Sequence, residues 1–201
     1  SYTLLVFVLD DFSRFFLHYL MHKVPLLWRF HQVHHSAEVM TPVTVYRVHP
    51  VESLLYALRL SLIQGVALGV GFYLFGHKLS LFDVLGANIF VFLFNILGAN
   101  LRRSHVWLTW WSPVEKWFIS PAQHQVHHSR ALIHRDKNFG TTLAIWDRLV
   151  GSLVISANVQ HRIIFGVKDN TITSSLFTLY FLPIKNATNS LLKSFRRFIS
   201  S

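Results

Sequence analysis

The chain has 201 residues, enough for one domain, and 52% of them are apolar while 14% are charged, against about 25% charged in ordinary soluble domains. This low charge indicates a membrane protein, and the absence of cysteine excludes disulfides and thiolate metal ligands. The net charge of +10 does not indicate nucleic-acid binding, because the basic residues lie mainly outside the apolar segments, as in loops facing an anionic cytoplasmic leaflet.

Three apolar segments predict membrane helices, each close to the roughly 20 residues that a bilayer requires. The first covers residues 3–20 and is interrupted by two aspartates and an arginine. The second covers residues 56–75 and the third residues 79–101, with only Gly76-His77-Lys78 between them. We therefore expect the second and third segments to form a tight helical hairpin.

The distribution of basic residues predicts the orientation. Residues 102–201 hold 13 of the 19 lysines and arginines, residues 21–55 hold three, and the hairpin tip holds only Lys78. By the positive-inside rule, the segments before and after the hairpin face the cytoplasm. Both segments then lie on the same side of the membrane.

The C-terminal half predicts no further membrane span. Four tryptophans between residues 107 and 117 are typical of the membrane–water interface. Residues 174–184 are apolar but few, and we expect Pro183 to end them, which predicts an interfacial helix.

The predicted fold class is all-α: a polytopic helical membrane protein with a cytoplasmic-side helical cap. The chain is expected to be a single domain, in which residues 1–55 and 102–201 flank the hairpin at 56–101. Because the sequence enters an apolar segment directly at Ser1, without a signal peptide, we expect an N-terminal part of the domain to be missing.

Eight of the 13 histidines fall into three clusters with helical spacing. The clusters are His18 and His22; His31, His34 and His35; and His124, His127 and His128. Spacings of three and four residues place imidazoles on one helix face, and a metal needs nitrogen ligands that converge to about 2.0–2.2 Å. With this histidine content, one H-x-x-H-H is expected about 0.05 times by chance, and the chain has two. The clusters therefore predict a metal site, and imidazoles without thiolates suit zinc, iron or copper.

The remaining histidines are weaker candidates. His105 follows the third apolar segment and so returns to the side of the clusters, where it is a candidate ninth ligand, with an ordinary structural role equally open. His49 and His134 are expected to support the ligands or the fold. His77 and His161 are isolated, as ordinary surface or hydrogen-bonding histidines are.

Asp11 lies two helical turns before His18, on the same helix face. An acid inside a predicted span is a functional candidate, and this one could accept the free N–H of a liganding imidazole and fix its tautomer. Pairing with Arg14 is the alternative. A similar supporting role is expected of Asp136 and Asn138, which follow the third cluster.

The three clusters, in this order and with a membrane hairpin between the second and third, resemble the fatty acid hydroxylase / sterol desaturase superfamily. The resemblance covers nearly the whole chain, which looks similar to bacterial members known only as sterol desaturase family proteins. The sequences flanking the clusters agree with it: Leu27-Trp28-Arg29-Phe30, Ser120-Pro121-Ala122-Gln123, Lys137-Asn138-Phe139-Gly140 and Trp146-Asp147-Arg148-Leu149.

The resemblance implies a centre of two iron ions, which zinc can replace in isolated protein, held by the eight clustered histidines. Such a centre uses dioxygen to hydroxylate or desaturate a C–H bond of a lipid, with NAD(P)H-derived electrons from a cytochrome, ferredoxin or reductase. The implied location is multi-pass in a bacterial inner membrane, with the clusters on the cytoplasmic side.

Two features of the resemblance concern single residues. His105 matches a further histidine of the family, in a segment where relatives tend to have His-x-His and this chain has Arg103 in place of the first histidine. A centre ligated by imidazoles alone is cationic, and Asp11, Asp136 or Asp147 could offset its charge.

Two other classes of protein remain as alternatives. A membrane protein that binds or transports metal without redox chemistry would also need histidines, but transporters place polar groups near the middle of the bilayer. A membrane cytochrome with two histidines on a haem needs only pairs, which leaves the triple clusters unexplained. The sequence does not choose among sterols, fatty acyl chains, carotenoids and ether lipids as substrate.

Overall fold

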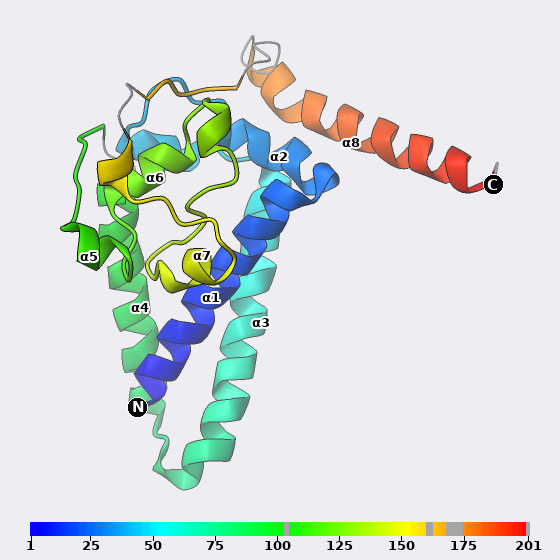
Figure 1. Ribbon diagram of the computed structural model, residues 1–201. Helices are drawn as coiled ribbons and strands as arrows, with labels where there is room; N and C mark the ends of the chain where they lie inside the picture. Colours follow the sequence, from blue (N-terminus) through cyan, green and yellow to red (C-terminus); the bar gives the residue numbers. More distant parts are fainter. Residues whose placement is uncertain (103–104, 160–162, 168–174, 200–201) are drawn as a thin grey trace.

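The computed structural model describes residues 1–102, 105–159, 163–167 and 175–199 (Figure 1). Its helices, with 3-10 helices marked η, are α1 (Tyr2–Lys23), α2 (Pro25–His35), η1 (Pro42–Tyr46), α3 (Pro50–Phe75), η2 (Gly76–Lys78), α4 (Leu81–Arg102), α5 (Ser112–Glu115), α6 (Pro121–His127), η3 (Leu132–His134), α7 (Ile145–Leu149), η4 (Ser156–Asn158) and α8 (Leu176–Ile199). Within these ranges there is no β-strand, apart from one isolated bridge between Phe118 and Leu143. The predicted all-helical fold is confirmed for the described residues.

Helix α1 packs against both α3 and α4, and the shorter helices gather at one end of these three (Figure 1). The short connection of the predicted hairpin is confirmed, because α3 and α4 are joined by η2 alone. Gly76 ends α3 with φ of +56°, a backbone conformation that glycine adopts without steric cost, so the chain can reverse there. The far end of the bundle is held by a small apolar core of Tyr2, Val6, Ala67, Leu79, Ala87 and Val91.

Helix α3 starts six residues before the predicted second span. His49 caps it, since its Nδ1 accepts from the Val51 N–H at 3.1 Å, and Pro50 occupies the first helical position, where its missing N–H costs nothing. Among the described residues, α3 is the one helix long and apolar enough to cross a membrane. Helix α4 offers a shorter apolar stretch, Leu81–Leu93, and α1 carries charged residues along its length.

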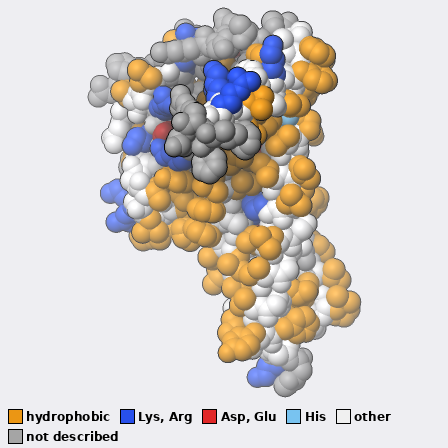
Figure 2. All heavy atoms as spheres, turned by 90° about the vertical axis from the view of Figure 1, so that its right-hand side faces the viewer, with side chains coloured by type: hydrophobic (Ala, Val, Ile, Leu, Met, Phe, Trp, Pro, Cys, Tyr) orange, Lys and Arg blue, Asp and Glu red, His pale blue; other side chains and the backbone are white. Residues whose placement is uncertain are grey.

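Large apolar side chains remain exposed along α3 and α4. Figure 2 shows hydrophobic side chains over the narrow end of the molecule. Leu58, Leu62 and Tyr73 of α3 and Phe82 and Ile89 of α4 are each more than half exposed. A continuous apolar surface of this kind is unusual on a soluble monomer and indicates a non-aqueous or protein partner.

The two aspartates of α1 have different kinds of partner. Asp10 lies between two arginines, with its Oδ2 2.8 Å from Arg14 Nε and its Oδ1 2.8 Å from Arg59 Nη1 of α3. Asp11 points to the other side of α1 and accepts from the Thr142 and Leu143 backbone N–H groups and from Trp146 Nε1. Asp10 thereby ties α1 to α3, and Asp11 ties it to the segment that leads into α7.

The C-terminal helix differs from the prediction. Pro183 does not end it: α8 continues through the proline to Ile199. Apolar residues recur at helical spacing on both sides of Pro183, and this continuous pattern outweighs the loss of a single backbone N–H. Several apolar side chains of α8, among them Phe181 and Ile184, are exposed.

Helix α8 is anchored at its start to the histidine-bearing end of the bundle. Leu179, with Tyr180 and Leu182 beside it, packs on Val33 of α2. His49 Nε2 donates to the Tyr180 carbonyl oxygen at 2.9 Å. His49 therefore acts at its two ring nitrogens on the start of α3 and on α8.

Candidate metal centre

The eight clustered histidines form two groups of converging ring nitrogens. In the five-histidine group, one nitrogen of each imidazole lies within 4.8 Å of one nitrogen of every other; its members are His18, His22, His31, His35 and His127. The same limit holds within the three-histidine group, made of His34, His124 and His128. All eight are buried except His22, which is partly exposed. The structure thus brings together the eight predicted ligands, as two adjacent sites.

The sequence clusters do not coincide with the two groups. His31 and His35 differ by about 40° around α2, whereas His34 lies about 100° from His35 and turns to the other group. The third cluster divides in the same way, with His127 in the five-histidine group and His124 and His128 in the other. Each H-x-x-H-H motif therefore contributes histidines to both groups, so the two groups must lie close together.

Local sequence positions these short helices. The chain turns at Val24, and Pro25 starts α2 immediately, so α2 folds back with its histidines facing those at the end of α1. Helix α6 starts at Pro121 behind a capping box in which Ser120 Oγ accepts from the Gln123 N–H and the Gln123 side chain accepts from the Ser120 N–H. Both helices are thus fixed at their N-termini.

The tautomers of two candidate ligands, His18 and His31, follow from their hydrogen-bond partners. His18 Nδ1 donates to the Phe139 carbonyl oxygen at 2.7 Å, and His31 Nδ1 donates to Glu52 Oε1 at 3.0 Å. Each Nε2 is then left with a lone pair, yet the two Nε2 atoms are 3.1 Å apart, and His35 Nε2 is 3.2 Å from that of His31. Lone pairs at this separation repel one another unless a cation lies among them. The donor set therefore fits a bound metal ion.

The protonation state also suits metal binding. Burial, followed by the neighbouring imidazoles of His128 and His127, lowers the pKa of His35 well below its usual value near 6.5. His35 is therefore neutral at pH 7 and available as a ligand. His22 Nε2 is buried and has no hydrogen-bond partner among the described residues, as expected for a nitrogen that faces a metal.

Glu52 is a site residue that the sequence analysis missed. It is 3% exposed in the first turn of α3, with Oε1 on His31 and Oε2 buried without a hydrogen-bond partner in the described part of the chain. A carboxylate that accepts the outer N–H of a liganding imidazole orients the ring and increases its basicity. The available signal was an acid three residues after His49, at the start of a helix that returns to the clusters.

The predicted supporting residues lie in varied places. Asp136 is ion-paired with Lys23 at 2.7 Å, and its Oδ1 lies 3.6 Å from His22 Nδ1, so it is next to a candidate ligand. His134 Nδ1 lies 2.8 Å from Ser129 Oγ. Asn138, at φ of +54°, donates to the Gln123 and Val154 carbonyl oxygens and holds the loop after α6.

Two other predictions are not matched by the geometry. Asp11 accepts from the segment 142–146, and no imidazole and no Arg14 contact is among its partners in the described residues. The helix turns its carboxylate toward α7, and Asp10 takes Arg14 instead. His105 is exposed and belongs to neither histidine group, and Arg103 lies outside the described residues.

Asp147 is linked to His18 through the backbone of Phe139. Its carboxylate accepts from the Phe139 and Gly140 N–H groups at 2.8 and 2.6 Å. Phe139 in turn offers its carbonyl oxygen to His18. Asp147 therefore fixes the backbone that fixes the ligand, and a side chain at Gly140 would meet Asp147 Oδ2 at 2.8 Å, which explains the glycine there.

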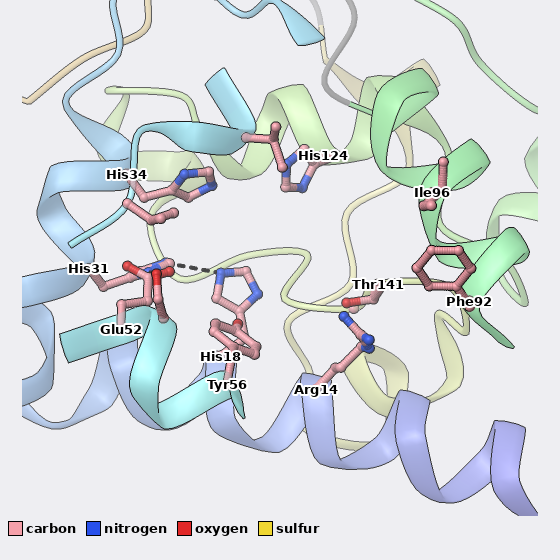
Figure 3. A pocket seen from close by; sticks show the side chains of 14 residues that line it. Arg14, His18, His31, His34, Glu52, Tyr56, Phe92, Ile96, His124 and Thr141 are labelled. Atoms are coloured by element: carbon pink, nitrogen blue, oxygen red, sulfur yellow. Dashed lines mark hydrogen bonds and ion pairs between the residues drawn. The ribbon is translucent and has the colours of Figure 1, made fainter. Parts of the chain in front are cut away.

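A cavity of about 470 Å³ adjoins both groups (Figure 3). His18 and His31 of the five-histidine group and His34 and His124 of the other line it. Its remaining walls come from α1, α3, α4 and nearby loops, and they include Tyr56, Phe92, Ile96, Val48 and Arg14. Its volume is in the range of small-molecule sites, roughly 300–1,000 Å³.

This arrangement defines a helical protein with two adjacent histidine groups, each able to hold a metal ion, beside a cavity. The model of the fatty acid hydroxylase family matches residues 3–152, so the chain belongs to this family, as the histidine clusters predicted. No solved structure was found to match the chain.

Relatives of this chain have names that are consistent with this family. The ornithine lipid hydroxylase OlsE of Rhizobium tropici is 31% identical over 147 residues, which are 72% of this chain and 39% of that protein. Alkylglycerol monooxygenase of Danio rerio is 27% identical over 180 residues, which are 89% of this chain and 35% of that protein. Alkylglycerol monooxygenase of Homo sapiens is 27% identical over 157 residues, which are 78% of this chain and 31% of that protein. The chain thus spans between 31% and 39% of the length of these relatives.

Proposed function

We propose that this chain is the catalytic part of a membrane-bound di-iron oxygenase that hydroxylates a C–H bond of a lipid with dioxygen. The observation that carries the proposal is the pair of adjacent histidine groups opening on one cavity. Hydroxylation is preferred to desaturation because the relatives are named as a lipid hydroxylase and monooxygenases.

The eight histidines would hold two iron ions, five imidazoles around one and three around the other. When bound, such a centre supplies activation of dioxygen and attack on an unactivated C–H bond. Eight nitrogen donors and no thiolate suit iron, and zinc is expected to bind the same nitrogens in isolated protein. His105 and Asp11 are not needed in this assignment.

The protein's own contribution is to orient the ligands and the lipid. Glu52 and the Phe139 carbonyl oxygen keep His31 and His18 in the tautomer that presents Nε2. Phe92 and Ile96 of α4 and Tyr56 of α3 line the cavity and keep an alkyl segment beside the histidines. Burial of these histidines excludes bulk water from the reacting carbon.

We propose a multi-pass location in the membrane, with α1, α3 and α4 within the bilayer. The exposed apolar side chains of α3 and α4 support this, and the hairpin returns both flanking segments to one side. The excess of basic residues outside the hairpin favours the cytoplasmic side of a bacterial inner membrane for the histidine sites. Helix α8, with its apolar face exposed, would lie along the interface.

The electrons would come from a separate donor such as a cytochrome, ferredoxin or reductase that draws on NAD(P)H. The chain has no cysteine with which to hold an iron–sulfur cluster of its own. The basic surface outside the hairpin suits an acidic donor protein.

Lipid mass spectrometry under isotopic dioxygen tests the proposal. Cells that express the natural protein are compared with cells that express a His31→Ala variant, both grown under ¹⁸O₂. The expected result is a lipid that gains one ¹⁸O atom with the natural protein alone. A lipid that loses two hydrogens without gaining oxygen would indicate desaturation instead, and identical lipids in both strains would contradict the proposal.

A further inference from the structure

The cavity beside the histidines contains a cationic side chain that the metal chemistry does not use. Arg14 of α1 lines it, and Figure 3 shows the guanidinium directed toward Thr141, on the opposite side of His18 from Glu52. Arg14 Nε is bonded to Asp10 at 2.8 Å, while its Nη groups have no hydrogen-bond partner among the described residues. The side chain is 25% exposed, and it is part of the cavity wall.

The local charges do not balance. Asp10 is shared by Arg14 and Arg59, so one positive charge is in excess. Arg59 has a side chain only 8% exposed, and its Nη1 is bonded to Asp10 and to Ser13 Oγ. Arg59 Nε is buried without a hydrogen-bond partner among the described residues, but Arg14 is the arginine of this pair that lines the cavity. A cation beside an apolar-walled cavity is costly unless an anion meets it, which makes such a residue a functional candidate.

No acid of the described cavity wall meets Arg14. Glu52 is the one carboxylate that lines the cavity, and it is engaged by His31. The rest of the wall near Arg14 is apolar or neutral, with Phe92 and Ile96 of α4 facing it. An occupant that satisfies both parts of this wall has an anionic oxygen group joined to an alkyl chain.

We infer that Arg14 binds an anionic oxygen group, a carboxylate or a phosphate, of the lipid that occupies the cavity. Guanidinium suits both groups, because its forked donors match two oxygens of one anion. The inference rests on the proposed function only in calling the ligand a substrate. Arg14 lies one helical turn, about 5.4 Å, before His18, so the anionic end of the lipid is held next to the metal sites. The reacting carbon is then close to the polar end of the lipid.

Ligand binding to the zinc-loaded full chain in detergent tests the inference without any turnover. Native mass spectrometry measures the affinity for three probes with the same chain: hexadecanoate, hexadecyl phosphate and hexadecanol. We expect at least one anion to bind about tenfold or more tightly than the alcohol, the size expected of a charge-assisted hydrogen bond. The preferred anion identifies the head group as carboxylate or phosphate.

Variants assign the preference to this arginine. Arg14→Gln keeps the shape but removes the charge and is expected to abolish the preference, whereas Arg14→Lys should keep most of it. Arg135→Gln, at an exposed position, is the matched control and should bind as the natural protein does. The inference is wrong if the natural protein binds the alcohol as well as both anions, or if Arg14→Gln keeps the preference.

The two proposals can fail separately. A chain that selects anions through Arg14 but never oxidises a lipid would refute the proposed function and leave the binding site. A chain that hydroxylates lipids but binds anionic and neutral head groups equally well would support the proposed function and refute the role of Arg14.

Discussion

Removal of the Glu52 carboxylate should weaken one metal site. Glu52 Oε1 accepts from His31 Nδ1 at 3.0 Å, and the side chain is 3% exposed, so no water replaces it readily. Loss of such an outer partner typically lowers metal affinity about 10- to 100-fold, or about 1.4–2.7 kcal/mol. Glu52→Gln keeps an oxygen acceptor and should fall at the low end of this range. Glu52→Ala leaves the His31 N–H buried and unpaired, and it should fall at the high end.

Competition with a chromophoric chelator measures this change. Zinc affinity is determined for the purified natural protein, for both Glu52 variants and for Glu38→Gln, an exposed glutamate that serves as the matched control. We expect the order natural protein equal to Glu38→Gln, then Glu52→Gln, then Glu52→Ala. Equal affinities in all four proteins would refute the assignment of Glu52 as the residue that orients His31.

Three further outcomes follow from the same geometry. His35→Ala and His128→Ala belong to different groups, so each should lower the metal content from two ions to about one per chain by elemental analysis; complete loss in both would show a single shared site. His105→Ala should retain both ions because His105 is exposed and in neither group, and loss of one ion would restore it as a ligand. The metal-free protein should lose thermal stability as the pH falls below about 6.5. The unfolded chain then takes up a proton at His35, whereas the folded chain does not, because folding lowers the pKa of His35. A melting temperature that stays constant from pH 7 to 5 would contradict this expectation.

Spacing along the chain was sufficient to predict which histidines come together. His31, His34 and His35 are close in sequence, so a helix brings them together without knowledge of the fold. The hairpin was also predictable, because a three-residue link between two apolar segments allows only an antiparallel return. What spacing could not show is that His34 turns to a different site from His31 and His35, since this depends on how α2 and α6 pack.

The partners of the buried carboxylates depend on contacts between distant segments. Glu52 meets His31 across 21 residues and Asp11 meets Leu143 across 132. Neither pairing leaves a local pattern, and the spacing that favoured Asp11 as a partner of His18 does not show that its carboxylate faces the segment before α7. The direction of this side chain depends on packing, which only the folded structure shows.

The C-terminal end of α8 could not be predicted from a single residue. Pro183 is a strong local signal for a helix end, and it led to the prediction that the helix stops there. The apolar periodicity that continues to Ile199 is weaker at each residue but extends over the whole helix.

The central claim is that two groups of histidines hold two iron ions in each chain. Elemental analysis with Mössbauer spectroscopy of the ⁵⁷Fe-loaded full chain tests it most directly. We expect close to two irons per chain and a spectrum of nitrogen-ligated, non-haem iron, and both should be lost in a His31→Ala, His128→Ala double variant. One iron per chain, or iron held as haem with a Soret band, would show that the two groups do not form a di-iron centre.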